Sequence, residues 1–253
     1  MIQRRILVTR PAGDADGLAD LLAERGLESV AVPTVAIDTE STAPAVARMV
    51  ASLGGAGWLV VTSANGARAV AARLGDGALP PGVRVAAVGP ATAEALSEAG
   101  IGVDHVPDDY LTVAIAQGLG PLSGRRVVLA RADAATPDLR EALLARGADV
   151  EEVVAYRTIE GPPASRDAIR ASLADGLAGI AFTSGSTVRG LVRLASPLDR
   201  GRARALPALC IGPVTARVAR SKGFHVPVVA DDHTAVGLAD AIAAHYLRSE
   251  EDR

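Results

Sequence analysis

The chain has 253 residues, enough for one large domain or two modest domains that each bury a core. Hydrophobic residues make up 49% and charged residues 22%, which is typical of a globular protein rather than a disordered one. The formal net charge of −3 argues against a broad basic surface for nucleic acid or anionic lipid. A single cysteine, Cys210, excludes an internal disulfide framework. With no long apolar segment, these features predict a cytoplasmic protein without membrane association.

Short apolar runs rich in Val and Ile alternate with Ala-, Leu- and Arg-rich segments of helical period along the chain. The predicted strands, in chain order, are 5–10, 28–33, 58–62, 84–88, 103–106, 126–131, 149–156, 179–183, 207–211 and 226–229. The predicted helices are 14–25, 43–53, 64–74, 91–99, 112–118, 136–146, 165–174, 186–195, 214–222 and 235–247. This alternation predicts βαβ units and mainly parallel sheets.

The sequence contains an internal duplication. At an offset of 121 residues, 4–10 align with 125–131, 22–26 with 143–147, and 62–63 with 183–184; at an offset of 123, 89–93 align with 212–216. Because the matching segments follow the same order in both halves of the chain, they predict a repeated unit of five strands and five helices. Five parallel strands with helices on both faces form a doubly wound, flavodoxin-like sheet, which binds ligands beyond the carboxyl ends of its strands. We therefore expect two such α/β domains with the chemistry in the cleft between them.

Ser63 and Ser184 occupy equivalent positions, each directly after a predicted strand and before a predicted helix. A serine there is a natural N-cap, because its oxygen accepts a hydrogen bond from a free backbone N–H group. The same N–H groups and hydroxyl also suit an anion bound at the helix N-terminus. Both interpretations stay open, and the presence of the serine in both copies supports the second.

Gly89 and Gly212 begin segments that repeat this geometry. Each glycine lets a ligand approach the backbone, and the proline after it fits the first position of a helix. Thr92 and Thr215, three residues further on, can turn their hydroxyl groups over the first helical turn. No segment matches a dinucleotide-binding or P-loop fingerprint, which argues against a nucleotide or phosphosugar enzyme.

Arg10 and Arg131 end equivalent predicted strands. A lone exposed arginine is usually a solvated charge, but the same residue at both strand ends also suits a cation that binds carboxylates. Tyr156 instead breaks the duplication, because Val35 occupies its position in the first copy. A phenol at the junction between the units suits a hydrogen bond to a substrate, although packing of the ring explains the position more simply.

The four histidines are scattered, and none has a cysteine or carboxylate at ligand spacing. No Ser–His–Asp arrangement is legible, which argues against hydrolysis by a nucleophile. The sequence therefore predicts no metal and no other cofactor.

These motifs together resemble the uroporphyrinogen-III synthase family of tetrapyrrole biosynthesis. The matching segments, in chain order, are 7–11, 32–33, 61–66, 88–93, 154–158, 182–184 and 211–216. Their order and spacing extend the resemblance over nearly the whole chain. One departure is Val214, which stands where some family members have a second hydroxyl before the matched threonine.

The resemblance implies that the two copies exchange their opening βαβ pieces. Domain one would then comprise 1–34 with 160–253, and domain two would comprise 41–149. Segments 35–40 and 150–159 would run side by side as linker strands. The residues alone do not distinguish this exchange from two contiguous domains. The resemblance also suggests a monomer.

The resemblance further implies a cyclising hydro-lyase of porphyrin and heme biosynthesis that needs no cofactor. Its substrate would be hydroxymethylbilane, a linear octa-carboxylate tetrapyrrole received from hydroxymethylbilane synthase. The product would be uroporphyrinogen III, with the last pyrrole ring inverted. Tyr156 would assist departure of the substrate hydroxyl. The expected substrate-binding residues are Arg10, Ser63, Gly89, Thr92, Arg131, Ser184, Gly212 and Thr215.

A second function from another class is a non-catalytic sensor that binds a tetrapyrrole or small anion on the same fold. Such modules often carry an appended DNA-binding domain. Here the sequence ends soon after its last predicted helix, which favours the enzyme.

Overall fold

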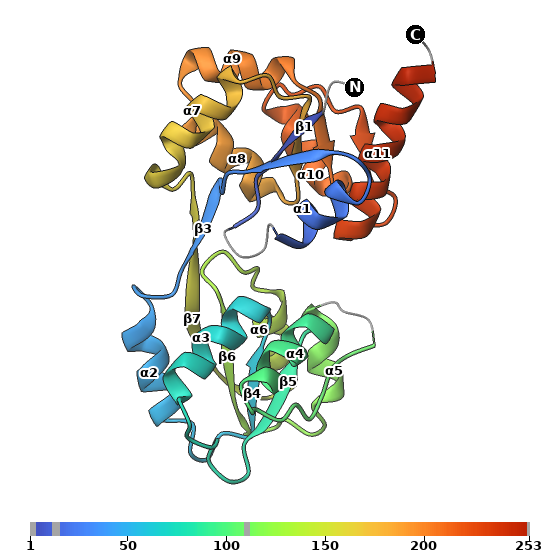
Figure 1. Cartoon of the computed structure of the whole chain (residues 1–253). Helices are drawn as coiled ribbons and strands as arrows, with labels where there is room; N and C mark the ends of the chain where they lie inside the picture. Colours follow the sequence, from blue (N-terminus) through green and yellow to red (C-terminus); the bar gives the residue numbers. More distant parts are fainter. Residues whose placement is uncertain (1–3, 12–15, 109–111, 252–253) are drawn as a thin grey trace. The chain divides into compact units, whose positions relative to one another are not determined.

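The computed structural model describes residues 4–11, 16–108 and 112–251 and divides the chain into two compact units (Figure 1). The first unit comprises Met1–Ala36 with Ile159–Arg253, and the second comprises Ile37–Thr158. Each unit is a parallel sheet with helices on both faces. The predicted α/β class with two doubly wound sheets is confirmed. Residues 14 and 15 of the first predicted helix lie outside the described part of the chain.

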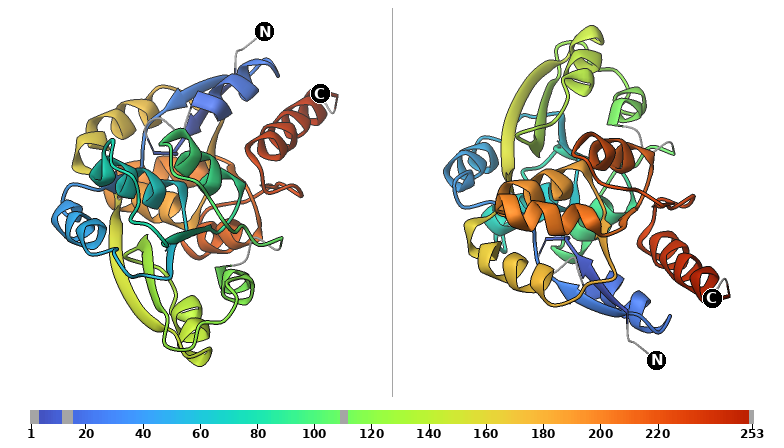
Figure 2. Two further views of the ribbon diagram at one scale, coloured as in Figure 1. Left: turned by 90° about the horizontal axis from the view of Figure 1, so that it is seen from below. Right: turned by 90° about the horizontal axis from the view of Figure 1, so that it is seen from above.

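The first unit is a three-layer sandwich around a sheet of order β10-β9-β8-β1-β2. Its elements are β1 (Arg5–Val8), α1 (Asp16–Ala23), β2 (Glu28–Ala31), α7 (Arg166–Ala174), β8 (Gly179–Phe182), α8 (Gly185–Leu194), α9 (Pro197–Ala205), β9 (Ala208–Cys210), α10 (Pro213–Ser221), β10 (Val228–Val229) and α11 (Ala235–Glu251), with a 3₁₀ turn at Pro163–Ser165. Leu7 and Phe182 point to the face covered by α7 to α10, whereas Ile6 and Leu209 point to α1 and α11. Helices α1 and α11, from opposite ends of the chain, pack together (Figure 2).

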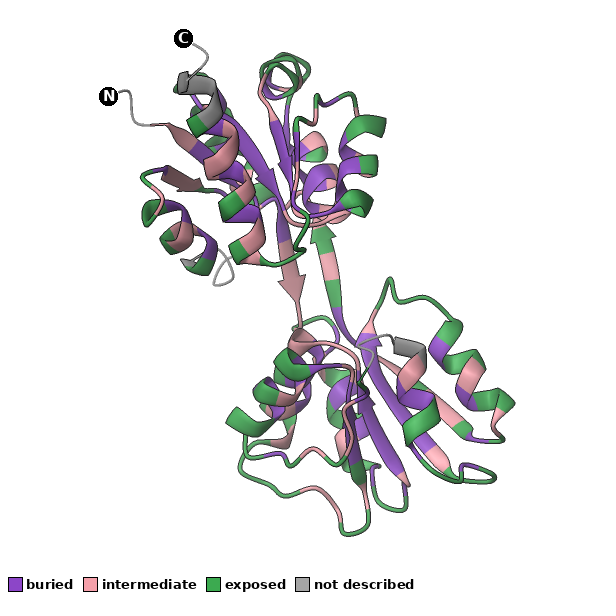
Figure 3. Cartoon of the chain, turned by 90° about the vertical axis from the view of Figure 1, so that its right-hand side faces the viewer, coloured by how far each residue is buried: buried purple, intermediate pink, exposed green. Residues whose placement is uncertain are grey.

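The second unit has the same construction, with the sheet order β3-β7-β6-β4-β5. Its elements are β3 (Val35–Asp38), α2 (Ala43–Ala51), β4 (Trp58–Val61), α3 (Ala64–Leu74), β5 (Arg84–Ala87), α4 (Pro90–Glu98), α5 (Thr112–Gly118), β6 (Arg126–Ala132), α6 (Asp138–Ala145) and β7 (Asp149–Glu160). Helices α2, α3 and α4 pack on one face of the sheet, and α5 and α6 pack on the other. Strands β4 and β8 are buried along their whole length, which is why they read as continuous apolar runs (Figure 3).

The two sheets share one pairing register, and they show how the duplication folds. Leu7 of β1 pairs with Ile180 of β8, and Val128 of β6 pairs with Leu59 of β4. The offset of 121 that relates the two copies relates these two pairs as well. The opening βαβ piece of the first copy (β1-α1-β2) thus completes the sheet that the second copy supplies. In exchange, β6-α6-β7 completes the sheet of the first copy.

Four segments differ from the prediction made from sequence periodicity. The range 103–106 pairs only through a single bridge from His105 to Ala86, because the Asp104 carboxylate accepts the Val85 N–H at 2.7 Å. Helix α9 was not predicted, and β3 was expected only as the linker strand that the resemblance implies for 35–40. Strand β7 runs further than predicted: it pairs with β6 from Asp149 to Tyr156 and continues to Glu160. The linker role expected for 35–40 and 150–159 stays a prediction.

Candidate active site

The predicted binding residues follow the carboxyl ends of parallel strands. In the first unit, Arg10 follows β1, Ser184 follows β8 and Gly212 follows β9. In the second unit, Ser63 follows β4 and Gly89 follows β5. Because carboxyl ends of parallel strands lie on one edge of a sheet, each unit gathers its own residues at the edge where doubly wound sheets usually bind ligands. The roles of these residues in binding stay predictions.

Both serines cap the helix that follows them. The Ser63 oxygen accepts the Gly66 N–H at 3.1 Å. The Ser184 oxygen accepts the Thr187 N–H at 3.2 Å, and the Thr187 hydroxyl accepts the Ser184 N–H at 3.4 Å, which completes a capping box. The capping interpretation is therefore confirmed. Within the described residues, the N–H groups of the first two positions of α3 and α8 have no acceptor, so capping still leaves donors for an anion.

The two glycine–proline loops are followed by a threonine in the first turn of α4 and of α10. Thr92 and Thr215 are 3% and 5% exposed, yet neither hydroxyl has a hydrogen-bond partner among the described residues or is fully buried. Gly89 and Gly212 are both extended. At Gly212 a Cβ would lie 2.9 Å from Cδ2 of His233, so the imidazole packs directly against this turn. His233 is a neighbour of the predicted site that its sequence position did not reveal.

The two strand-end arginines are not equivalent. Arg131 is 1% exposed, lies 3.3 Å from Glu152 Oε2, and donates to the carbonyl of Thr136. Arg10 is half-buried and has no ion pair among the residues described. The Arg131 charge is neutralised inside the second unit, because a buried cation needs a partner. A role in substrate binding for Arg131 stays a prediction, and it requires that ion pair to open.

Tyr156 lies where β6 ends, next to an irregularity in strand pairing. Arg131 pairs with Val154 and Ala132 pairs with Tyr156, so β7 contains one extra residue at this point. The ring is 8% exposed and packs in the cluster that includes Leu59. Its hydroxyl has no hydrogen-bond partner among the described residues and is not fully buried. The ring therefore packs in the core, and the binding role of the hydroxyl stays a prediction.

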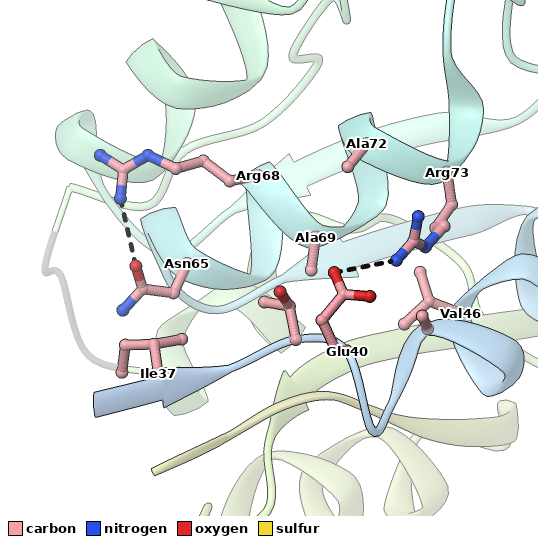
Figure 4. Close-up of a pocket in the computed structure, with 10 residues that line it drawn as sticks. Ile37, Glu40, Val46, Asn65, Arg68, Ala69, Ala72 and Arg73 are labelled. Atoms are coloured by element: carbon pink, nitrogen blue, oxygen red, sulfur yellow. Dashed lines mark hydrogen bonds and ion pairs between the residues drawn. The ribbon is translucent and has the colours of Figure 1, made fainter. Parts of the chain in front are cut away.

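A cavity of about 380 Å³ lies between β3, α2 and α3 of the second unit (Figure 4). Asn65 and Arg68 lie at one end and Glu40 and Arg73 at the other, with Ala69 between them on α3. The sequence does not single out Arg68, because it is one of several exposed arginines on helices. The only sequence signal was its position five residues after Ser63.

Cys210 lies in the core of the first unit, and burial raises the pKa of its thiol to about 12 against a smaller opposing effect of Arg220. It is a buried apolar group and a poor nucleophile. The described residues include no group of three His, Cys, Asp or Glu side chains placed to hold a metal ion. None of the described helices is long and apolar enough to cross a membrane.

Comparison with known proteins finds one family along most of the sequence. A model of the family described as "Uroporphyrinogen-III synthase HemD" matches residues 16–240. The chain is also 30% identical to a uroporphyrinogen-III synthase of Synechococcus elongatus, over 96% of this chain and 95% of that protein.

Two solved structures share the fold. A mutant uroporphyrinogen III synthase of Thermus thermophilus matches 99% of this chain and all of its own, with a TM-score of 0.59 and 20% identity. A uroporphyrinogen-III synthetase of Helicobacter pylori matches 96% of this chain and all of its own, with a TM-score of 0.62 and 15% identity. At these identities the structural likeness shows the fold alone.

Proposed function

Because the chain belongs to the uroporphyrinogen-III synthase family, we propose that it closes hydroxymethylbilane to uroporphyrinogen III with loss of water. The observation that carries this proposal within the chain is the set of strand-end loops, which recur in both units. Each loop offers helix N–H groups that have no acceptor among the described residues, together with a serine or threonine hydroxyl. Such loops suit a substrate that carries eight carboxylates.

In the proposed reaction the hydroxyl group of the bilane departs as water, which leaves an electrophilic azafulvene. The substituted carbon of the last ring attacks this centre and forms a spiro intermediate. That intermediate fragments and recloses with the last ring inverted. Because the uncatalysed closure gives the uninverted isomer I, the protein must hold a flexible chain in one conformation, which is a task of orientation.

We assign Tyr156 to the departing hydroxyl. A phenol is a hydrogen-bond donor at neutral pH, and donation to a leaving oxygen stabilises the charge that develops on it. The Tyr156 hydroxyl has no hydrogen-bond partner among the described residues, which supports this role, as does the strand irregularity that places Tyr156 opposite the end of β6. Residues Ser63, Thr92, Ser184 and Thr215 would hold carboxylates beside the helix N-termini. A cytoplasmic location, a monomeric state and handover of the bilane from hydroxymethylbilane synthase complete the proposal.

The test is turnover of freshly generated hydroxymethylbilane, followed by oxidation and chromatographic separation of the uroporphyrin isomers. We expect isomer III in excess over a reaction without protein. Isomer I alone, formed at the uncatalysed rate, would reject the enzyme and leave a non-catalytic tetrapyrrole- or anion-binding sensor as the alternative.

A further inference from the structure

The cavity between β3, α2 and α3 has an apolar lining and a charged group at each end. Ile37, Val46 and Ala69 supply apolar walls. Its volume of about 380 Å³ lies within the size range of small-molecule sites. An apolar body flanked by polar groups is the usual construction of a site for an aromatic ring with a charged substituent.

The two ends of this cavity differ in net charge. Arg73 lies 3.6 Å from Glu40, so the charges at that end cancel. At the other end, Arg68 donates to the side-chain oxygen of Asn65 at 3.1 Å (Figure 4). The amide is neutral, and no carboxylate among the described residues pairs with Arg68. This end therefore presents a positive charge that a carboxylate of a ligand would neutralise.

The same cavity is connected to the segment that holds Tyr156. Val46 and Ala69, which line the cavity, belong to the buried cluster that contains the Tyr156 ring. At the start of α2, Thr42 donates its hydroxyl to the carbonyl of Ala155 at 2.8 Å. The helix wall of the cavity is thus bonded to the residue directly before Tyr156.

We propose that this cavity binds one carboxylate-bearing pyrrole ring of the bilane, with the ring against the apolar walls and Arg68 paired to a carboxylate arm. This inference rests on the proposed function and adds a subsite to it. Arg68 is suited to the task because its planar guanidinium can pair with a carboxylate through two N–H groups. The strand-end loops would hold carboxylates through backbone N–H groups and neutral hydroxyl groups, whereas this subsite would hold one through a charged side chain.

The experiment compares Arg68→Gln with Arg48→Gln in the full chain. Arg48 is a matched control, because it is an exposed arginine on α2 that does not line the cavity. We expect Arg68→Gln to raise KM for hydroxymethylbilane about 10-fold, the effect of one lost hydrogen bond to a charged group, with kcat little changed. Arg68→Lys should recover part of the loss, since it keeps the charge without the planar fork. Arg48→Gln should behave as the wild type.

A second readout uses a monopyrrole that carries one acetate and one propionate arm. We expect it to raise the melting temperature of the wild type and of Arg48→Gln, but not of Arg68→Gln. If the wild type makes isomer III and the two variants have equal KM values, the subsite is overturned and the activity stays in place. Isomer I alone from the wild type would reject the activity itself, so the two failures are distinguishable.

Discussion

Two tyrosines in this chain differ in what their hydroxyl groups do. Both rings are buried to the same degree, at 8% exposed. The Tyr246 hydroxyl donates to the carbonyl of Ala178 at 2.7 Å, and burial raises its pKa to about 12. The Tyr156 hydroxyl has no such partner among the described residues. A hydrogen-bond donor to a substrate requires a buried ring with an unpaired hydroxyl. Packing of the ring then holds the hydroxyl in place, while no protein group uses its hydrogen-bonding capacity.

We expect Tyr156→Phe to lower kcat by about 10²-fold, because it removes the proposed donor to the leaving hydroxyl and keeps the ring. The free energy of unfolding should change by less than about 0.5 kcal/mol, since no hydrogen bond is lost. The measurement is steady-state turnover together with urea denaturation. Tyr246→Phe is the control, and it should lose stability but no activity. Unchanged turnover of Tyr156→Phe would remove Tyr156 from the mechanism.

Cys210 should resist thiol reagents at pH 8 while the protein is folded. Its pKa is raised by burial to about 12, so the reactive thiolate is scarce at that pH. Because the folded pKa lies above the ordinary thiol value, the stabilising effect of this shift is present below that value. It is lost as pH rises towards 12. Absorbance of released thionitrobenzoate, compared in buffer and in guanidinium, measures the protection. Rapid labelling of the native protein would contradict this account.

At the scale of elements, a helix and a connecting segment can cross only where their backbones can approach closely. Gly190 of α8 packs against the carbonyl of Thr34, which is fully buried and accepts the Gly161 N–H at 2.9 Å. A Cβ at Gly190 would collide with that carbonyl oxygen and lie 2.9 Å from its carbon. The glycine therefore lets the chain that leaves the first unit pass close to α8.

Gly190→Ala should lower the free energy of unfolding by about 2 to 3 kcal/mol, because the helix or the crossing segment must shift. Gly201→Ala is the matched control. It lies in α9 with no neighbouring atom within 4 Å of an added Cβ, so it should stabilise the protein by up to about 1 kcal/mol. Thermal or urea denaturation distinguishes the two. A neutral Gly190→Ala would show that the crossing is not tightly packed.

At the scale of the whole molecule, the exchange of βαβ pieces makes the two copies interdependent. The pairs β1–β8 and β4–β6 each join a strand of one copy to a strand of the other. The second unit, by contrast, is one continuous stretch of chain, Ile37–Thr158, and it contains both of its own helix layers.

We expect a fragment of residues 37–158 to fold alone, because the strand pairs β6–β7, β4–β6 and β4–β5 and both cores lie within it. The two sequence repeats, 1–121 and 122–253, should each fail to fold, since the first lacks β6 and β8 and the second lacks β1 and β4, the strands that pair across the copies. Far-UV circular dichroism with thermal melting tests the three fragments. Mixing the two repeats should restore cooperative unfolding. A cooperative transition in either repeat alone would contradict the expected interdependence.

Much of the fold was predictable because local sequence preference and tertiary packing favour the same secondary structure in most segments. Strands β4 and β8 are buried on both sides, so their apolar runs are unambiguous. Helix α9 was missed because it is polar and contains Gly201, although Ser196 followed three residues later by Asp199 is a typical N-terminal signal. Strand β3 shows no alternation of apolar and polar residues, so periodicity did not predict it, and only the family resemblance placed a strand at 35–40.

The sequence by itself determined the repeat, the parallel sheets and the helix N-termini that follow the strands, because these depend on periodicity and capping within short segments. Only the tertiary structure decided which copy completes which sheet. The two copies share one register, so either pairing satisfies the same apolar pattern. It also decided that Arg131 is neutralised by Glu152, and that Arg68 faces a cavity without a carboxylate partner among the described residues. Charge pairing depends on which side chains meet in space, and the order of residues along a chain does not reveal that.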